Sequence, residues 1–210
     1  MGLKLSPVVE SDIGEMMEVF FRAFDGDPML DVLFPGGNTP AVRDAGGKRC
    51  WKDWNSDPAT SVTKCVDTET GAILGWAQWN VYTQERPEEQ WKAKVEVTWN
   101  EGRGKEICTT ILDAMGSMRQ KVWQGKPFIW CGIVCCDPNH QRRGVGTLLM
   151  SWGEEQARKH SLSVYLEASP AGYPLYIKLG FKQVDTVVIK AEDWDGDSDR
   201  HYPCMVRTYE

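Results

Sequence analysis

Apolar positions near the start of the chain predict a strand followed by a helix. Leu3 and Leu5 alternate with polar neighbours, as in a strand with one buried face. Asp12 and Glu15 then have the spacing of a helix N-cap residue and its partner three positions later. An apolar stripe at helical spacing continues from them and comprises Ile13, Met16, Met17, Phe20 and Phe24.

The pattern weakens between this helix and residue 60. A second, short helix is expected where Asp27-Pro28 precedes the run MLDVLF, and Pro35-Gly36-Gly37 ends it. From Gly36 to Lys48 the chain is rich in glycine, proline and charge without an apolar period, which predicts a mobile loop. Cys50 to Trp54 fits one further helical turn.

The middle of the chain predicts a hairpin and a long helix. Residues 61–67 and 72–82 have strand character and flank the turn Thr68-Glu69-Thr70-Gly71. Residues 91–99 alternate only in part, so they are either an extension of the sheet or an irregular segment. Residues 105–122 carry an apolar stripe that is typical of a helix.

An almost unbroken apolar run from Phe128 to Cys136 predicts a strand that is buried on both faces. Asp137-Pro138-Asn139 ends it, because proline cannot continue a strand ladder and Asp and Asn favour turns. A glycine-containing turn follows, and a helix that reaches His160 begins within it. The rest of the chain predicts strands at 162–168, 181–190 and 202–209, a helix at 174–179, and a hairpin made of the last two strands.

The turn after this strand has the features of an anion-binding site. Gly144 and Gly146 lack side chains, so a bulky anion can approach the backbone N–H groups closely. The helix start adds a fractional positive charge, and Arg142 and Arg143 add full ones. A Walker A loop would end in Gly-Lys-Ser/Thr, and a dinucleotide fingerprint would need glycine where Leu149 stands. The expected ligand is therefore a pyrophosphate from another cofactor.

Two motifs relate this chain to a known family. Gln-x-x-Gly-x-Gly directly after an apolar strand resembles the GNAT superfamily of acyl-CoA N-acyltransferases. The segment from Leu175 to Phe181, LYIKLGF, is similar to the Leu-Tyr-x-Lys-x-Gly-Phe signature that closes the acyl-CoA site of that family. Phe24-Asp25-Gly26-Asp27-Pro28 and Phe34-Pro35 are similar to a fungal-type branch.

The resemblance implies a fold and a cofactor. We expect one α/β domain over residues 1–210, with a mixed, mostly antiparallel sheet that is splayed at the acyl-CoA site and has helices on both faces. Residues 128–181 would bind acetyl-CoA as co-substrate, and residues 1–60 would lie on the acceptor side. The expected cofactor contacts are Val134, Cys135, Cys136, Gln141, Arg142, Arg143, Gly144, Val145, Gly146, Thr147, Ser169, Tyr173 and Tyr176.

The resemblance also implies catalytic roles. The pantetheine arm would run along the strand, where a backbone N–H near Cys135 or Cys136 would face the thioester oxygen. Tyr176 stands at the family's tyrosine position and is a candidate acid for the leaving thiolate; a core tyrosine is the alternative. Glu167 is a candidate base, because some members that acetylate protein N-termini carry a glutamate there. An ordinary salt bridge at Glu167, and Glu96 or a water chain as the base, are the alternatives.

The implied function is acetyl transfer to a primary amine of a small molecule or peptide, by direct attack on the thioester. The N-terminal helices and the Gly36–Lys48 segment are where we expect the acceptor to be selected. A CoA-binding sensor or scaffold without activity is one alternative, and an acyltransferase that uses a longer acyl-CoA or a hydroxyl acceptor is another. The oligomeric state is not predicted.

Net charge and cysteine content indicate which partners and which cellular compartment to expect. A net charge of −6 over 210 residues disfavours nucleic acid and anionic lipid as partners. The start of the chain is not a signal peptide by pattern, and seven cysteines without a Cys-x-x-Cys pair indicate a reduced, cytoplasmic protein. Met1-Gly2 opens a myristoylation pattern, although a first strand is the favoured interpretation.

No metal site is predicted. The three histidines lack the spacing to a cysteine that a zinc site requires. The acidic run from Asp193 to Asp199 lacks the glycine and glutamate positions of a calcium loop, so it is interpreted as a solvated hairpin tip.

Overall fold

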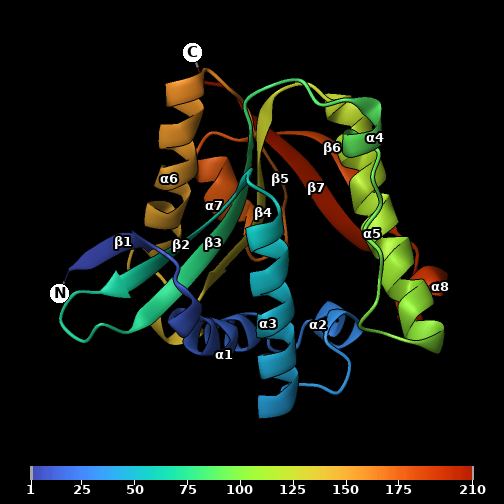
Figure 1. Ribbon diagram of the computed structural model, residues 1–210, viewed down its shortest axis with the longest axis horizontal. Helices are drawn as coiled ribbons and strands as arrows, with labels where there is room; N and C mark the ends of the chain where they lie inside the picture. Colours follow the sequence, from blue (N-terminus) through green and yellow to red (C-terminus); the bar gives the residue numbers. More distant parts are fainter. Residues whose placement is uncertain (1, 210) are drawn as a thin grey trace.

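The fold is organised around a sheet with β3 and β4 near its middle (Figure 1). Within residues 2–209, which the computed structural model describes, seven strands follow the order β1-β2-β3-β4-β5-β7-β6. β4 pairs in parallel with β5, and the remaining neighbours are antiparallel, which confirms the predicted mixed sheet. The strands are β1 (Leu3–Pro7), β2 (Thr60–Asp67), β3 (Ile73–Tyr82), β4 (Phe128–Cys136), β5 (Val164–Glu167), β6 (Lys182–Ile189) and β7 (Arg200–Arg207).

Side chains alternate across β3, which places large apolar groups on both faces of the sheet. Trp76 faces α1 (Ile13–Ala23), and its indole Nε1 donates to the Met16 carbonyl at 2.9 Å. Trp79 faces the opposite side and packs in the core that holds Leu149 of α6 (Val145–His160). α7 (Tyr173–Lys178) joins α6 on that face, and α5 (Gly102–Trp123) lies on the α1 face. Helices therefore cover both faces, as predicted.

Both predicted hairpins are present. β2 and β3 pair around the turn at 68–71, and β6 pairs with β7, although β7 lies between β5 and β6 in the sheet. The short helix α8 (Ala191–Trp194) stands between β6 and β7. The acidic tip is not simply solvated, because Asp195 pairs with Arg103 at 2.7 Å and Asp199 pairs with Lys190 at 2.8 Å.

The predicted mobile loop at Gly36–Lys48 is wrong. Residues in it belong to α3 (Pro40–Ser56), a helix that begins with Thr39 as its N-cap and Pro40 in its first turn. Gly46 and Gly47 are both buried, and α3 uses them to pack closely against Phe34 and Ile13. The contact stripe of α3 is therefore partly made of glycines, which a hydrophobicity pattern interprets as loop signals.

Other local predictions differ in detail. The Asp12 carboxylate accepts from the Val9 N–H at 2.8 Å and so caps the short turn η1 (Glu10–Asp12) rather than α1. Glu15 accepts from the Ile73 N–H at 2.7 Å, which ties α1 to β3. The predicted short helix is α2 (Pro28–Leu33), and the uncertain segment at 91–99 is irregular after α4 (Glu88–Trp91).

The chain ends and the helices bear on two further expectations. β1 begins at Leu3 as predicted, whereas Met1, which opens the myristoylation pattern, lies outside the described residues. None of the helices within residues 2–209 combines the length and the hydrophobicity that crossing a bilayer requires.

Replacing Gly46 by alanine tests the close packing of α3. A Cβ there would come within 2.6 Å of a ring atom of Phe34, which is itself buried. We expect the free energy of unfolding to fall by about 1–2 kcal/mol, despite the better helix propensity of alanine. Gly116→Ala on α5 is the matched control, because an added Cβ meets nothing within 4 Å, and it should raise stability by up to about 1 kcal/mol. Urea denaturation measures both, and changes of the same sign would contradict the packing argument.

Candidate functional site

The central feature of the site is a split between two parallel strands. β4 pairs with β5 only at Ile129–Cys131, opposite Val164–Leu166. Gly132 then forms a bulge, because Trp79 pairs with Cys131 whereas Gln78 pairs with Ile133. Beyond the bulge β4 continues along β3 and separates from β5, so the sheet opens on the β5 side. The splayed sheet that the sequence predicted is confirmed.

The open edge of β4 presents backbone groups to this gap. The Asp137 N–H donates to the Leu74 carbonyl on β3 at 2.9 Å. Since successive residues of a strand point their N–H and C=O groups to opposite sides, Cys135 also faces β3, whereas Val134 and Cys136 face the gap. Of the two cysteines predicted to approach a thioester, Cys136 is therefore the one whose N–H faces the gap.

The turn between β4 and α6 combines left-handed backbone residues with a helix start whose N–H groups are free. Gly144 has φ of 91°, and the preceding Arg142 has φ of 61°, both in the left-handed region. The first intrahelical bond runs from the Leu148 N–H to the Gly144 carbonyl at 2.9 Å. The N–H groups of residues 144–147 precede that bond, so they are oriented outward along the helix axis. Gln141 and Thr147 are exposed beside them, and Val145 is buried.

The two arginines of the turn differ in their surroundings. Arg142 is exposed, whereas Arg143 contacts Asp67 at 3.1 Å and His140 Nδ1 at 2.6 Å. A backbone hydrogen bond from Glu69, together with Arg143, lowers the pKa of the Asp67 carboxyl. Part of the Arg143 charge is thus used to attach the turn to β2, and Arg142 is the arginine more available to an anion.

Arg22 of α1 braces the same turn, and the sequence patterns did not reveal it. Its Nε and Nη2 atoms donate to Asp137 Oδ2 at 3.0 and 2.8 Å, while Asp137 Oδ1 accepts from the Asn139 N–H at 2.9 Å. Burial acts to raise the pKa of the Asp137 carboxyl, but these hydrogen bonds and the Arg22 charge lower it on balance. The turn is therefore held from the α1 side of the sheet.

Tyr176 occupies a buried position on α7. Its ring packs against Phe181 with centroids 5.9 Å apart, and only 8% of the residue is exposed. Burial, with smaller effects from Cys131 and Cys136, raises the pKa of its phenol. The side chain is thus protonated at neutral pH and lines a cavity.

That cavity, about 380 Å³ in volume, lies between the sheet and the helices α1, α2 and α5. Its floor includes Gln78 of β3, Gly132 and Val134 of β4, and Glu167 of β5, and Ser169 and Tyr176 extend it toward α7. The cavity therefore reaches the split between β4 and β5 at one end and the N-terminal helices at the other.

Glu167 lies in this cavity but makes the salt bridge that was its alternative interpretation. Its Oε1 accepts from Arg119 at 2.7 Å and its Oε2 accepts from Trp130 Nε1 at 3.1 Å. The Arg119 guanidinium lies 4.1 Å from the centre of the Trp130 ring. Arg119 was missed from the sequence, because a single arginine on a long helix has no local signal. Glu96, the rival base, is exposed and outside the residues that line the cavity.

Among the other predicted residues, Ser169 lines the cavity, whereas Tyr173, Cys135 and Cys136 lie outside its lining. Ser169 Oγ accepts from the Gly172 N–H at 3.2 Å, and Tyr173 donates through its hydroxyl to Gln183 at 3.4 Å. Burial raises the pKa of the Cys136 thiol to about 11 and raises that of Cys135 strongly. Both cysteines are therefore neutral thiols at physiological pH and poor nucleophiles.

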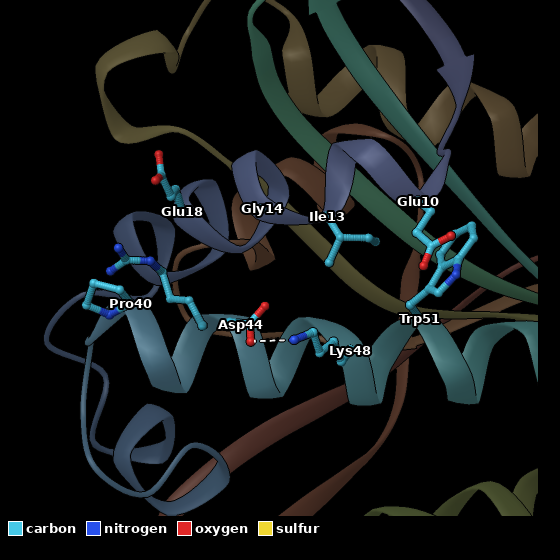
Figure 2. A pocket seen from close by; sticks show the side chains of 9 residues that line it. Glu10, Ile13, Gly14, Glu18, Pro40, Asp44, Lys48 and Trp51 are labelled. Atoms are coloured by element: carbon cyan, nitrogen blue, oxygen red, sulfur yellow. Dashed lines mark hydrogen bonds and ion pairs between the residues drawn. The ribbon is translucent and has the colours of Figure 1, made fainter.

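A second cavity, of about 360 Å³, lies between α1 and α3 (Figure 2). Glu10 of η1 and Glu18 of α1 lie on one side of it, and Asp44 and Lys48 of α3 lie on the other side, paired with each other at 2.7 Å. The Gly36–Lys48 segment thus contributes to this surface depression and not to the cavity that holds Tyr176. α1 and α2, the other predicted acceptor elements, do line the Tyr176 cavity.

Comparisons with known proteins agree with this geometry. Residues 104–183 match a family model described as an acetyltransferase (GNAT) domain. The probable acyltransferase SID5 of Ajellomyces capsulatus is 30% identical over 118 residues, which are 56% of this chain and 81% of that protein. A histone acetyltransferase HPA2-related structure from Corynebacterium glutamicum has 19% identity and a TM-score of 0.64, with coverage of 100% and 98% of the two chains. The putative acetyltransferase yncA of Salmonella typhimurium, solved with its cofactor acetyl-CoA, has 14% identity, a TM-score of 0.56 and coverage of 100% and 95%.

Replacing Asp137 by asparagine tests the brace between α1 and the turn. At pH 7 the change should lower the free energy of unfolding by roughly 1–3 kcal/mol, the usual loss for hydrogen bonds to a charged group. Because the folded-state pKa of Asp137 is depressed, its contribution is present above the unfolded value near 3.9 and is lost as the pH falls through the folded value. Urea denaturation at pH 7 and pH 3 should show the difference between the two proteins shrinking; a constant difference would count against the brace.

Proposed function

The chain belongs to the GNAT superfamily of acyl-CoA-dependent acyltransferases, and we propose that it transfers an acetyl group from acetyl-CoA to a primary amine of a small molecule or peptide. One observation carries the proposal. The split between β4 and β5 lies beside the free N–H groups of α6 and opens into the cavity lined by Tyr176. The seven unpaired cysteines support a reducing compartment such as the cytoplasm.

The residues at the split fit acetyl-CoA. The N–H groups of residues 144–147 suit a pyrophosphate, and Arg142 adds a nearby positive charge. The gap-facing backbone of Val134 and Cys136 suits the amide groups of a pantetheine arm, which can pair with an open strand edge. When bound, acetyl-CoA supplies an activated acyl thioester.

The open edge of β4 also supplies electrostatic assistance. The Cys136 N–H is fixed by the strand and faces the gap, so it can donate to an oxygen on which negative charge develops. A donor that is already oriented needs no reorganisation during the reaction, which is why such groups accelerate acyl transfer. The helix dipole of α6 acts in the same direction.

Tyr176 is proposed as the acid that protonates the leaving thiolate. Burial raises its pKa, so the phenol is protonated at neutral pH and carries a proton at the cavity. Direct attack by the amine agrees with the neutral thiols of Cys135 and Cys136, which supply no nucleophile.

Glu167 is proposed as the acceptor of the amine proton. A carboxylate offers about four lone-pair positions, so hydrogen bonds from Arg119 and Trp130 leave capacity for a further N–H or a bridging water. The hydrogen bond from Arg119 also fixes the Glu167 carboxylate in the cavity. Arg119 therefore positions the group that accepts the proton.

Thermal unfolding with added ligands tests the proposal. Acetyl-CoA at about a hundred times its dissociation constant should stabilise the fold by roughly 2.7 kcal/mol, and ATP and NAD should not. CoA and a long-chain acyl-CoA complete the series, and preference for the long-chain donor would replace the acetyl assignment by the longer-acyl alternative. Absence of a shift with any CoA compound would overturn the proposed function.

Tyr176→Phe tests the acid. We expect kcat to fall by roughly a hundredfold, because one general acid contributes about that much or more. The thermal shift with acetyl-CoA should stay the same, since the ring remains in place. Tyr82→Phe is the matched control, because Tyr82 is outside the cavity. The centre of its ring lies 3.7 Å from the guanidinium carbon of Arg86. Thiol release measures turnover, and full activity of Tyr176→Phe would refute the assignment.

A further inference from the structure

The walls of the cavity are mainly apolar. Side chains from α1, α2 and α5 face one another across it, above the sheet residues that form its floor. The wall residues are Phe20, Phe24, Met29, Leu30, Leu33, Ile111, Leu112 and Met115. A bound molecule would gain most by placing apolar surface between these helices.

The charges of the cavity are already paired. Among the residues that the structure describes, the charged side chains that line it are Asp27, Arg119 and Glu167. Glu167 binds Arg119 at 2.7 Å, and Asp27 binds Arg200. A ligand charge held between these helices would lie against apolar side chains or compete for one of these pairs, and both are costly.

Gln78 stands at the inner end of a fixed chain of hydrogen bonds. The chain begins at Asp57, whose carboxylate can only accept. Asn80 Nδ2 donates to Asp57 Oδ2 at 3.0 Å and to Thr60 Oγ1 at 2.8 Å, so both amide hydrogens of Asn80 are used. Asn80 Oδ1 then accepts from Gln78 Nε2. The acceptor at Asp57 therefore determines the orientation of both amides.

This orientation turns Gln78 Oε1 toward the bulge of β4. Gln78 is only 8% exposed and lines the cavity. Its Oε1 lies against Gly132, so closely that a side chain at residue 132 would overlap it. An oriented acceptor atom is thus held at the cavity floor beside the strand that leads to the split.

We propose that the acceptor is an amine on an uncharged, apolar body, and that Gln78 Oε1 receives a hydrogen bond from its nitrogen. This inference rests on the proposed function, because it identifies the substrate class of the same site. The amine N–H groups bind the floor at Gln78, and the body of the molecule lies between α1, α2 and α5. The lone pair of the amine then remains free for attack.

Three amines of equal chain length test the substrate class. Hexylamine, 1,6-diaminohexane and 6-aminohexanoate carry a methyl group, an ammonium and a carboxylate at the far end. With acetyl-CoA present, we expect kcat/KM for hexylamine to exceed both others by roughly tenfold or more. Equal or better acetylation of either charged amine would overturn the inference, as would acetylation of none of the three. If the inference fails in this way but acetyl-CoA still raises the temperature of thermal unfolding, the proposed acyl-CoA function stands.

Two substitutions test Gln78 itself. Gln78→Leu removes the acceptor atom, and KM for hexylamine should rise roughly tenfold. Asp57→Asn keeps an oxygen for the Ala59 N–H, which Asp57 Oδ1 accepts at 2.9 Å, but turns an NH₂ group toward Asn80. That reverses both amides, so Gln78 presents NH₂ to the cavity, and amine KM should rise by a similar factor.

Matched controls separate this role from a structural one. Gln90→Leu on α4 and Asp44→Asn on α3 make the same chemical changes at exposed positions, and they should leave KM unchanged. The acetyl-CoA thermal shift of Gln78→Leu and Asp57→Asn should equal that of the unchanged protein. Unaltered amine KM in both variants would refute the role of Gln78. Loss of the acetyl-CoA thermal shift in both variants would show that the hydrogen bonds from Asp57 to Gln78 maintain the fold, and it would also refute the role of Gln78.

Discussion

A strand can bond two neighbours only while its residues stay in register with both. In this protein β4 loses that register at Gly132, where one extra residue keeps β4 aligned with β3 and turns its other edge away from β5. This bulge shapes the site in three ways. It exposes the backbone of Val134 and Cys136, it opens the floor of the cavity, and it leaves room for Gln78 above a residue without a side chain.

Two helices beside the split, α6 and α7, contribute further groups to the site. α6 begins at Val145, after the turn that follows the end of β4 at Cys136, so its free N–H groups follow the open strand edge in the chain. α7 places Tyr176 beside the same opening from the other side of the sheet. The site therefore follows from the order of elements in one stretch, β4 to α7, whereas its acceptor half is assembled from distant parts of the chain.

This division explains what could be predicted from the sequence. The run from Phe128 to Phe181 has strong local signals, since buried strands, glycine turns and the motif around Tyr176 are all readable within short windows. Gly46 and Gly47 misled the prediction of α3 because their small size serves a contact that only the folded chain contains. Arg22 and Arg119 were missed because their partners are far away in sequence. Gln78 was missed although a polar residue inside the apolar strand β3 was a signal that could have identified it.

α1 contacts both halves of the site, so a movement of this helix affects both. Phe20 and Phe24 form part of the acceptor wall, and Arg22, between them in sequence, holds Asp137 at the turn that precedes α6. A three-turn helix moves as a unit, so any displacement of the wall is transmitted to the turn and any displacement of the turn to the wall. Binding in the acceptor cavity and binding at the turn before α6 are then coupled. Each binding event changes the affinity of the other by the same factor.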